Sequence, residues 1–149
     1  MLAGFLAVSV MNVSAASSDS AVIANSGSTN TIAFEITIDK SGDAEFREIP
    51  RGAAEQSHAP QTIRIKLPES LKSRIFSDLE SAKPLTSLPA GGCLKSSSFG
   101  TRARIRFGGE ETPDLSCPNA TNPRIQALRR DMNNVVEAFH VNLLRRPVN

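Results

Sequence analysis

The sequence predicts an α+β fold, a mostly antiparallel sheet of about five strands with two helices packed on one face. Apolar and polar residues alternate over residues 32–39, 44–49, 62–67 and 101–107, which is the period of a half-buried strand. A fifth strand follows the last of these across a glycine turn. Two further segments carry apolar stripes with helical spacing. The predicted order is three strands, a helix, two strands and a helix.

Residues 101–117 are the stretch around which the rest is organised, because they form a hairpin that ends in a cysteine. Their apolar residues alternate with Arg102, Arg104 and Arg106. The glycine pair at 108–109 predicts a two-residue turn. This turn sets Phe107 opposite Glu110 and Arg106 opposite Glu111. The second pair joins opposite charges, which stabilises a hairpin by about 0.2–1 kcal/mol.

The earlier strands form a local unit. Residues 32–39 and 44–49 predict a hairpin around the turn at 40–43, and residues 62–67 predict a third strand after a surface loop at 50–60.

The two predicted helices begin and end at recognisable residues. Pro68 opens the first, since its missing N–H costs nothing in the first turn, and Pro84 stops it. Its apolar stripe is Leu71, Ile75, Leu79 and Ala82. Asn122 caps the second helix and Pro123 takes its first position. The stripe there is Ile125, Leu128, Met132, Val135 and Phe139, and we expect it to lie on the sheet.

The 149 residues suffice for one domain. Residues 1–16 read as a signal peptide, with cleavage after Ala15 or Ala16, although no basic residue precedes the short apolar run. The alternative is an apolar helix or strand that stays in the fold. Residues 17–30 are rich in small polar residues and predict a flexible lead-in. The domain itself spans 31–144 and a solvated tail spans 145–149. No segment resembles a transmembrane helix.

Two cysteines remain, Cys93 and Cys117, and an even number in an exported chain suggests one disulfide bond. The alternative is two free, buried thiols. If residues 93–100 paired with 101–107 as a plain meander, Cys117 would lie on the order of 20 Å from Cys93, too far for a bond. The meander and the bond exclude each other. We favour the bond, with residues 94–100 as a loop or a short, offset strand.

The chemistry-bearing residues form no recognisable catalytic or metal-binding set. His58 and His140 have no partners at metal-ligand spacing, and no cofactor motif is present. With 5% aromatic residues and a net charge of +2, the chain is a poor candidate for nucleic-acid binding. The candidate ligand-binding residues are Lys95, Ser97 and Ser98 in a polar loop and Arg102, Arg104 and Arg106 on one strand face.

Three motifs together resemble a group of small exported bacterial proteins of unknown function. They are GSTNT at 27–31, CLKSSSFGT at 93–101 and PDLSCP at 113–118. The resemblance implies an exported protein, periplasmic or secreted, and supports pairing Cys93 with Cys117. It brings no catalytic residues.

These observations favour a non-enzymatic exported domain that binds a protein or an envelope component. The alternative is a small hydrolase or ligand-binding protein with its site at residues 95–101. A third hypothesis is binding of anionic envelope polymers by the arginine face. The oligomeric state is not predicted.

Overall fold

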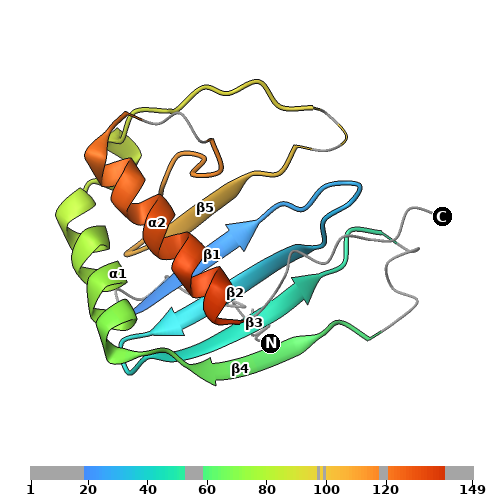
Figure 1. Cartoon of the computed structure of the whole chain (residues 1–149), viewed down its shortest axis with the longest axis horizontal. Helices are drawn as coiled ribbons and strands as arrows, with labels where there is room; N and C mark the ends of the chain where they lie inside the picture. The colour runs from blue at the N-terminus through green and yellow to red at the C-terminus, as the bar shows by residue number, and fades with distance from the viewer. Residues whose placement is uncertain (1–18, 53–58, 97, 99, 118–120, 140–149) are drawn as a thin grey trace, which may run out of the picture.

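The computed structural model describes residues 19–52, 59–96, 98, 100–117 and 121–139. These residues form one six-stranded antiparallel sheet and two α-helices, so the predicted α+β class is confirmed (Figure 1). The strands are β1 (Ser20–Asn25), β2 (Ala33–Asp39), β3 (Asp43–Ile49), β4 (Thr62–Lys66), β5 (Ala103–Phe107) and β6 (Glu110–Glu111). The helices are α1 (Glu69–Ala82) and α2 (Pro123–Ala138), with a short 3-10 helix, η2 (Leu85–Ser87), after α1.

Some predicted segments fall outside the described residues. The predicted signal peptide at 1–16 and the tail at 145–149 are among them. Across the part of the chain that is described, no helix has the length and apolar character needed to cross a membrane.

The prediction of a flexible lead-in over residues 17–30 is wrong, because Ser20–Asn25 form the inner strand β1. The sheet order is β4-β3-β2-β1-β5-β6, so β1 lies between β2 and β5 and pairs with both. Ala21 and Ile23 are buried. Serine and alanine have little intrinsic strand propensity, and the stability of such a strand comes from its neighbours on both sides. The strand that the sequence analysis did not predict is therefore β1, because the composition of residues 17–30 suggested a flexible segment.

A single apolar row explains why the five longer strands align as they do. Ile23 of β1 pairs with Ile36 of β2 on one side and with Ile105 of β5 on the other. Phe46 of β3 continues the row from Ile36 and then pairs with Ile63 of β4. A shift of one residue in any strand would turn its apolar side chain to the opposite face, so burial of this row fixes the register.

The β5–β6 hairpin has the predicted register, but its charge pairs differ from the predicted one. Phe107 pairs with Glu110, and Arg106 lies opposite Glu111 across the glycine turn. However, the Arg106 guanidinium reaches over β1 and binds Glu35 of β2, while Glu111 accepts a 2.7 Å hydrogen bond from Arg104. The sequence predicted the Arg106–Glu111 pair without strand β1, and β1 is the strand that brings β2 and its Glu35 to this side of β5.

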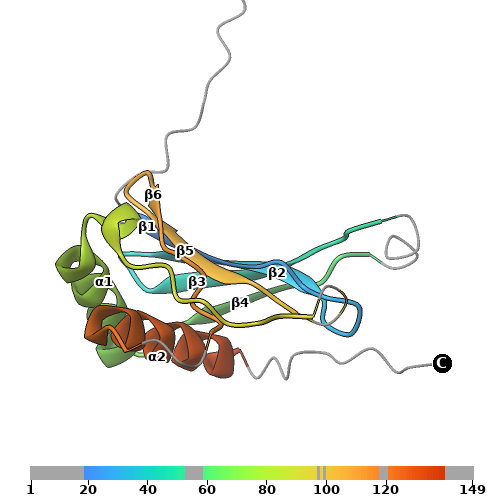
Figure 2. The same cartoon turned by 90° about the horizontal axis from the view of Figure 1, so that it is seen from above.

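Both helices cover the same face of the sheet, as predicted (Figure 2). The cap of α2 is also as predicted, since Asn122 Oδ1 accepts hydrogen bonds from the main-chain N–H groups of Arg124 at 2.9 Å and Ile125 at 3.2 Å. The predicted stripes are buried: Leu71, Ile75, Leu79 and Ala82 on α1, and Ile125, Leu128, Met132, Val135 and Phe139 on the second helix and its C-cap. The opposite face of the sheet carries exposed charged residues.

A charged cluster joins the two helices where the stripe pattern alone predicts apolar contact. Asp131 of α2 is fully buried, and its Oδ1 accepts hydrogen bonds from Arg74 Nε at 2.7 Å and Arg130 Nε at 3.1 Å. Its Oδ2 has no hydrogen-bond donor. Asp78 of α1 is held by Arg130 at 3.1 Å. Burial and then the neighbouring Asp131 carboxylate raise the pKa of Asp78, so a proton on Asp78 can be donated to Asp131.

The substitution Asp78→Asn is expected to stabilise the protein at neutral pH by about 0.5–1 kcal/mol. The amide supplies a permanent donor for Asp131 Oδ2 and removes the like charge, at the expense of a half-exposed ion pair with Arg130. Because the pKa of Asp78 is raised in the folded state, wild-type stability falls as pH rises through that pKa. The variant should lack this fall. Urea denaturation at mildly acidic and neutral pH measures both effects, and an equal pH response in the two proteins would contradict the carboxyl pair.

Candidate functional site

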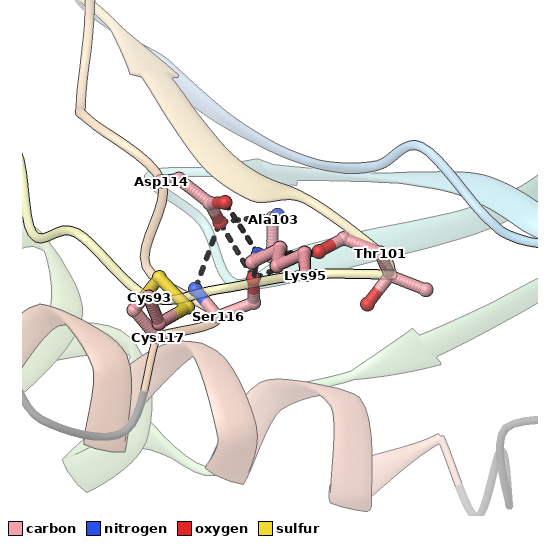
Figure 3. The surroundings of a disulfide bond; sticks show 7 residues. All are labelled: Cys93, Lys95, Thr101, Ala103, Asp114, Ser116 and Cys117. Carbon is pink, nitrogen blue, oxygen red and sulfur yellow. Dashed lines mark hydrogen bonds and ion pairs between the residues drawn. A yellow bond between two sulfur atoms is a disulfide. The ribbon is translucent and has the colours of Figure 1, made fainter. Parts of the chain in front are cut away.

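The disulfide bond between Cys93 and Cys117 is formed, and the two Cα atoms lie 5.6 Å apart (Figure 3). The pairing confirms the prediction that residues 93–100 do not form a meander strand with β5. Strand β5 instead has β1 and β6 as its neighbours. The bond ties the segment after η2 to the segment after β6, two stretches that share no β-ladder.

Beside the disulfide, Lys95 is held by three acceptors (Figure 3). Its Nζ donates to Asp114 Oδ2 and to the main-chain oxygen of Thr101, each at 2.5 Å, and also to Ser116 Oγ. The side chains of Lys95 and Asp114 are only 20% and 16% exposed, so water screens this ion pair less than it would a surface pair. We call Lys95, Asp114 and Ser116 the lysine clamp.

The other oxygen of Asp114 fixes the backbone around it. Asp114 Oδ1 accepts hydrogen bonds from the N–H groups of Ala103 at 3.1 Å and Ser116 at 3.0 Å, and from Ser116 Oγ at 2.6 Å. Burial raises the pKa of this carboxyl, but hydrogen bonds from Lys95, from Ser116 and from Ala103 outweigh it and bring the pKa down to about 2. Asp114 is therefore a carboxylate throughout the range in which proteins normally work.

Acid is expected to release the lysine clamp. The pKa of Asp114 is about 2 in the folded protein against an ordinary 3.8, so the unfolded chain binds the proton first as pH falls. The stabilisation is complete above about pH 4 and disappears as pH falls through about 2, with a size of about 1–2 kcal/mol. Urea denaturation between these pH values should show this loss in the wild type and not in Asp114→Asn. Glu80→Gln, a change in a surface ion pair on α1, is the control and should keep the wild-type response.

The loop that follows the clamp docks on the hairpin between β1 and β2. The main-chain oxygen of Ser98 accepts hydrogen bonds from Thr29 N at 2.9 Å and Thr29 Oγ1 at 2.7 Å. Gly27 turns this hairpin with φ +64°, and a Cβ there would lie 2.6 Å from the N atom of Ala33. Gly100 is equally confined, because its Cβ would lie 2.6 Å from the oxygen of Ser96. Residues from all three sequence motifs thus contribute contacts that hold this loop, among them Thr29, Lys95 and Asp114.

The candidate arginines lie on the open face of the sheet, and two of them are neutralised there. Arg104 binds Glu111 and Arg106 binds Glu35. Arg102 has no ion pair among the described residues, and its main chain joins β5 to Ser26. An open hollow of about 440 Å³ beside it is lined by both signs of charge: Arg51, Arg102, Arg104, Glu35 and Glu111. Mixed charge weakens the case for a polyanion on this face.

The two candidate loop residues that the structure describes, Lys95 and Ser98, have separate partners in the fold. Lys95 points to the clamp, Ser98 uses its main-chain oxygen on the hairpin, and Ser97 lies outside the described residues. Lys95 contacts Ser116 Oγ, which would suit a lysine base beside a serine nucleophile. Here, however, Lys95 Nζ donates a hydrogen bond to the Asp114 carboxylate, and Ser116 Oγ donates to that same carboxylate. Both groups are therefore engaged in hydrogen bonds within the fold.

Sequence reasoning missed Asp114 and Ser116, the partners of Lys95. Their spacing is the available signal, since an aspartate two residues before a serine favours a local side-chain-to-backbone turn. Among the described residues no group of three or more histidine, cysteine, aspartate or glutamate side chains could hold a metal ion.

The fold and the clamp together define a disulfide-bonded α+β domain that holds an extended loop by its side chains. No protein-family model matches the chain, and no curated protein matches it.

Proposed function

We propose that this protein is a non-enzymatic exported domain that binds a protein or an envelope component through the loop held by the disulfide and the lysine clamp. The observation that carries the proposal is the satisfaction of Lys95 by Asp114, Ser116 and Thr101. An enzyme keeps its reactive amine or hydroxyl turned to substrate, whereas here both are consumed in fixing the loop. The disulfide supports an oxidising destination, periplasmic or secreted.

The test is capture from an envelope extract of the source cell, followed by binding measurements with the purified partner. Oxidised wild-type protein should retain the partner. Asp114→Asn, which loosens the loop without removing any exposed side chain, should bind it more weakly. Arg64→Ala, on the distant edge strand β4, is the matched control and should bind as the wild type does.

An opposite outcome would identify the alternative function. If the oxidised protein turned over an ester or amide substrate, and Lys95→Ala or Ser116→Ala abolished the turnover, the clamp would be a catalytic pair. If purified candidates did not bind the wild type at any salt concentration, the binding function itself would be wrong.

A further inference from the structure

The hollow on the open face of the sheet lies over the two middle strands, β1 and β2. Ala24 of β1 stands there between its partners in register, Glu35 of β2 and Arg104 of β5. Further along β2, Ala33 lies opposite Ile49 of β3. Two methyl groups are therefore surrounded by longer side chains on the same face, and this difference in length makes the hollow. Its volume of about 440 Å³ is within the range of pockets that bind small molecules.

Arg102 brings to this hollow a positive charge that has no acidic partner. The other two arginines of the same strand face are paired with glutamates. The exposed side chain of Arg102 forms no ion pair or hydrogen bond among the described residues. Its main chain is fixed, because its N–H group donates to Ser26 Oγ and its oxygen accepts from Ser26 N, both at 2.9 Å. A guanidinium group in this position can bind an anionic ligand.

The two ends of the hollow limit the charge of the ligand. The end near the β1–β2 hairpin is bordered by Arg51, which is held in place because it donates to the main-chain oxygens of Ser28 and Thr31. The other end carries Glu35 and Glu111, each already paired with an arginine. A second anionic group would find no unpaired cation at that end. The hollow therefore favours a ligand with a single negative charge.

We propose that this hollow binds a small organic molecule that has one carboxylate group and an apolar body. The carboxylate pairs with the guanidinium of Arg102, whose planar fork of donors matches the two carboxylate oxygens. The apolar body lies over the methyl groups of Ala24 and Ala33 and beside Ile49. This site is separate from the loop of the proposed function, and neither depends on the other.

The probes are hexanoate, phenylacetate and benzoate, each compared with its uncharged primary amide by NMR of the oxidised full-length protein. The acids should shift the main-chain amide signals of residues 24–26, 33–35 and 102–104. They should bind about tenfold more tightly than the amides, which lack the charge that the guanidinium recognises. Affinity should fall between about 0.05 M and 0.3 M NaCl, because salt screens an exposed ion pair. Failure of all three acids to shift these signals would overturn the proposal.

Arg102→Gln and Arg64→Gln are a matched pair of variants that tests the anchor. Both remove one positive charge from the open face of the sheet. Arg64, however, lies on β4 outside the hollow and is bound by Glu45 at 2.6 Å. Affinity for the acids should fall about tenfold in Arg102→Gln and stay unchanged in Arg64→Gln. Equal affinities in the two variants would contradict the assigned role of Arg102.

Ala24→Leu tests the floor of the hollow. Ala24 is only partly buried, so a leucine there would fill the hollow without entering the core. Binding of the acids should be lost while the melting temperature stays close to that of the wild type. Wild-type affinity in this variant would overturn the hollow as the site. If leucine unfolds the protein, the two arginine variants decide alone.

Shifts centred on the lysine clamp in place of residues 24–26, 33–35 and 102–104 would also overturn the site. None of these outcomes bears on capture of an envelope partner by the loop, so the two proposals fail separately.

Discussion

Replacing Cys93 and Cys117 together with serine is expected to lower the free energy of unfolding by about 3 kcal/mol. The bond joins residues 24 apart in sequence, and a cross-link of this length restricts the unfolded chain by about that amount in the chain-entropy model. The midpoint of urea denaturation measures the loss. Reductant should produce the same loss in the wild type and none in the double variant. Equal stability of oxidised and double-variant protein would contradict a structural role for the bond.

The same variant should also loosen the lysine clamp. Cys93 lies two residues before Lys95, and Cys117 lies directly after Ser116, so the bond holds both sides of the ion pair in place. Without it, the pKa of Asp114 should move from about 2 back toward its ordinary 3.8. An NMR titration of the carboxyl group measures this directly. An unchanged pKa would show that the clamp forms independently of the bond.

The substitution Phe107→Ala is expected to cost about 3–5 kcal/mol, the largest effect of any single substitution predicted for this chain. Phe107 is fully buried at the end of β5. Its ring meets Phe76 of α1 edge-on, with 5.8 Å between the centroids, and Lys83 Nζ lies 4.7 Å from the ring centroid. Alanine would remove the ring that joins the sheet to α1 and leave a cavity.

Two further variants define what the Phe107 measurement means. Phe107→Leu keeps most of the volume and should lose clearly less stability than alanine does. Leu94→Ala removes a side chain that is already fully exposed, and should change the free energy of unfolding by less than about 0.5 kcal/mol. Urea midpoints at constant slope provide the comparison. Similar losses in Phe107→Ala and Leu94→Ala would contradict the burial pattern.

Local patterns predicted the elements whose signals are strong in the sequence itself. The glycine pair at 108–109, the cap at Asn122 and the two helical stripes act over a few neighbouring residues, and the structure has all of them. The cysteine pairing was also predictable, because two cysteines admit only one bond. Strand β1 was not predictable from local patterns, because Ala21 and Ala24 carry little strand signal and are stabilised by partners elsewhere in the chain.

The residues of the candidate site also divide into those that the sequence pointed to and those that only the fold brings in. Lys95 stood out in the sequence as a basic residue in a polar loop, but its partner Asp114 lies 19 residues further on. Lys95 also donates to Ser116 Oγ, whereas the neighbouring Ser98 accepts hydrogen bonds from Thr29. The arginine face looked basic for the same reason, because Glu35 is 71 residues from Arg106 along the chain, and only the folded sheet lets Arg106 bind it across β1.

The sequence by itself determined the fold class, the register of the last hairpin, the apolar face of each helix and the identity of the one cross-link. Each depends on residues close together in the chain, or on a choice with a single solution. The tertiary structure alone decided that β1 completes the sheet and that Lys95 forms an ion pair with Asp114 inside the fold. These depend on contacts between distant segments, whose energies no local pattern contains.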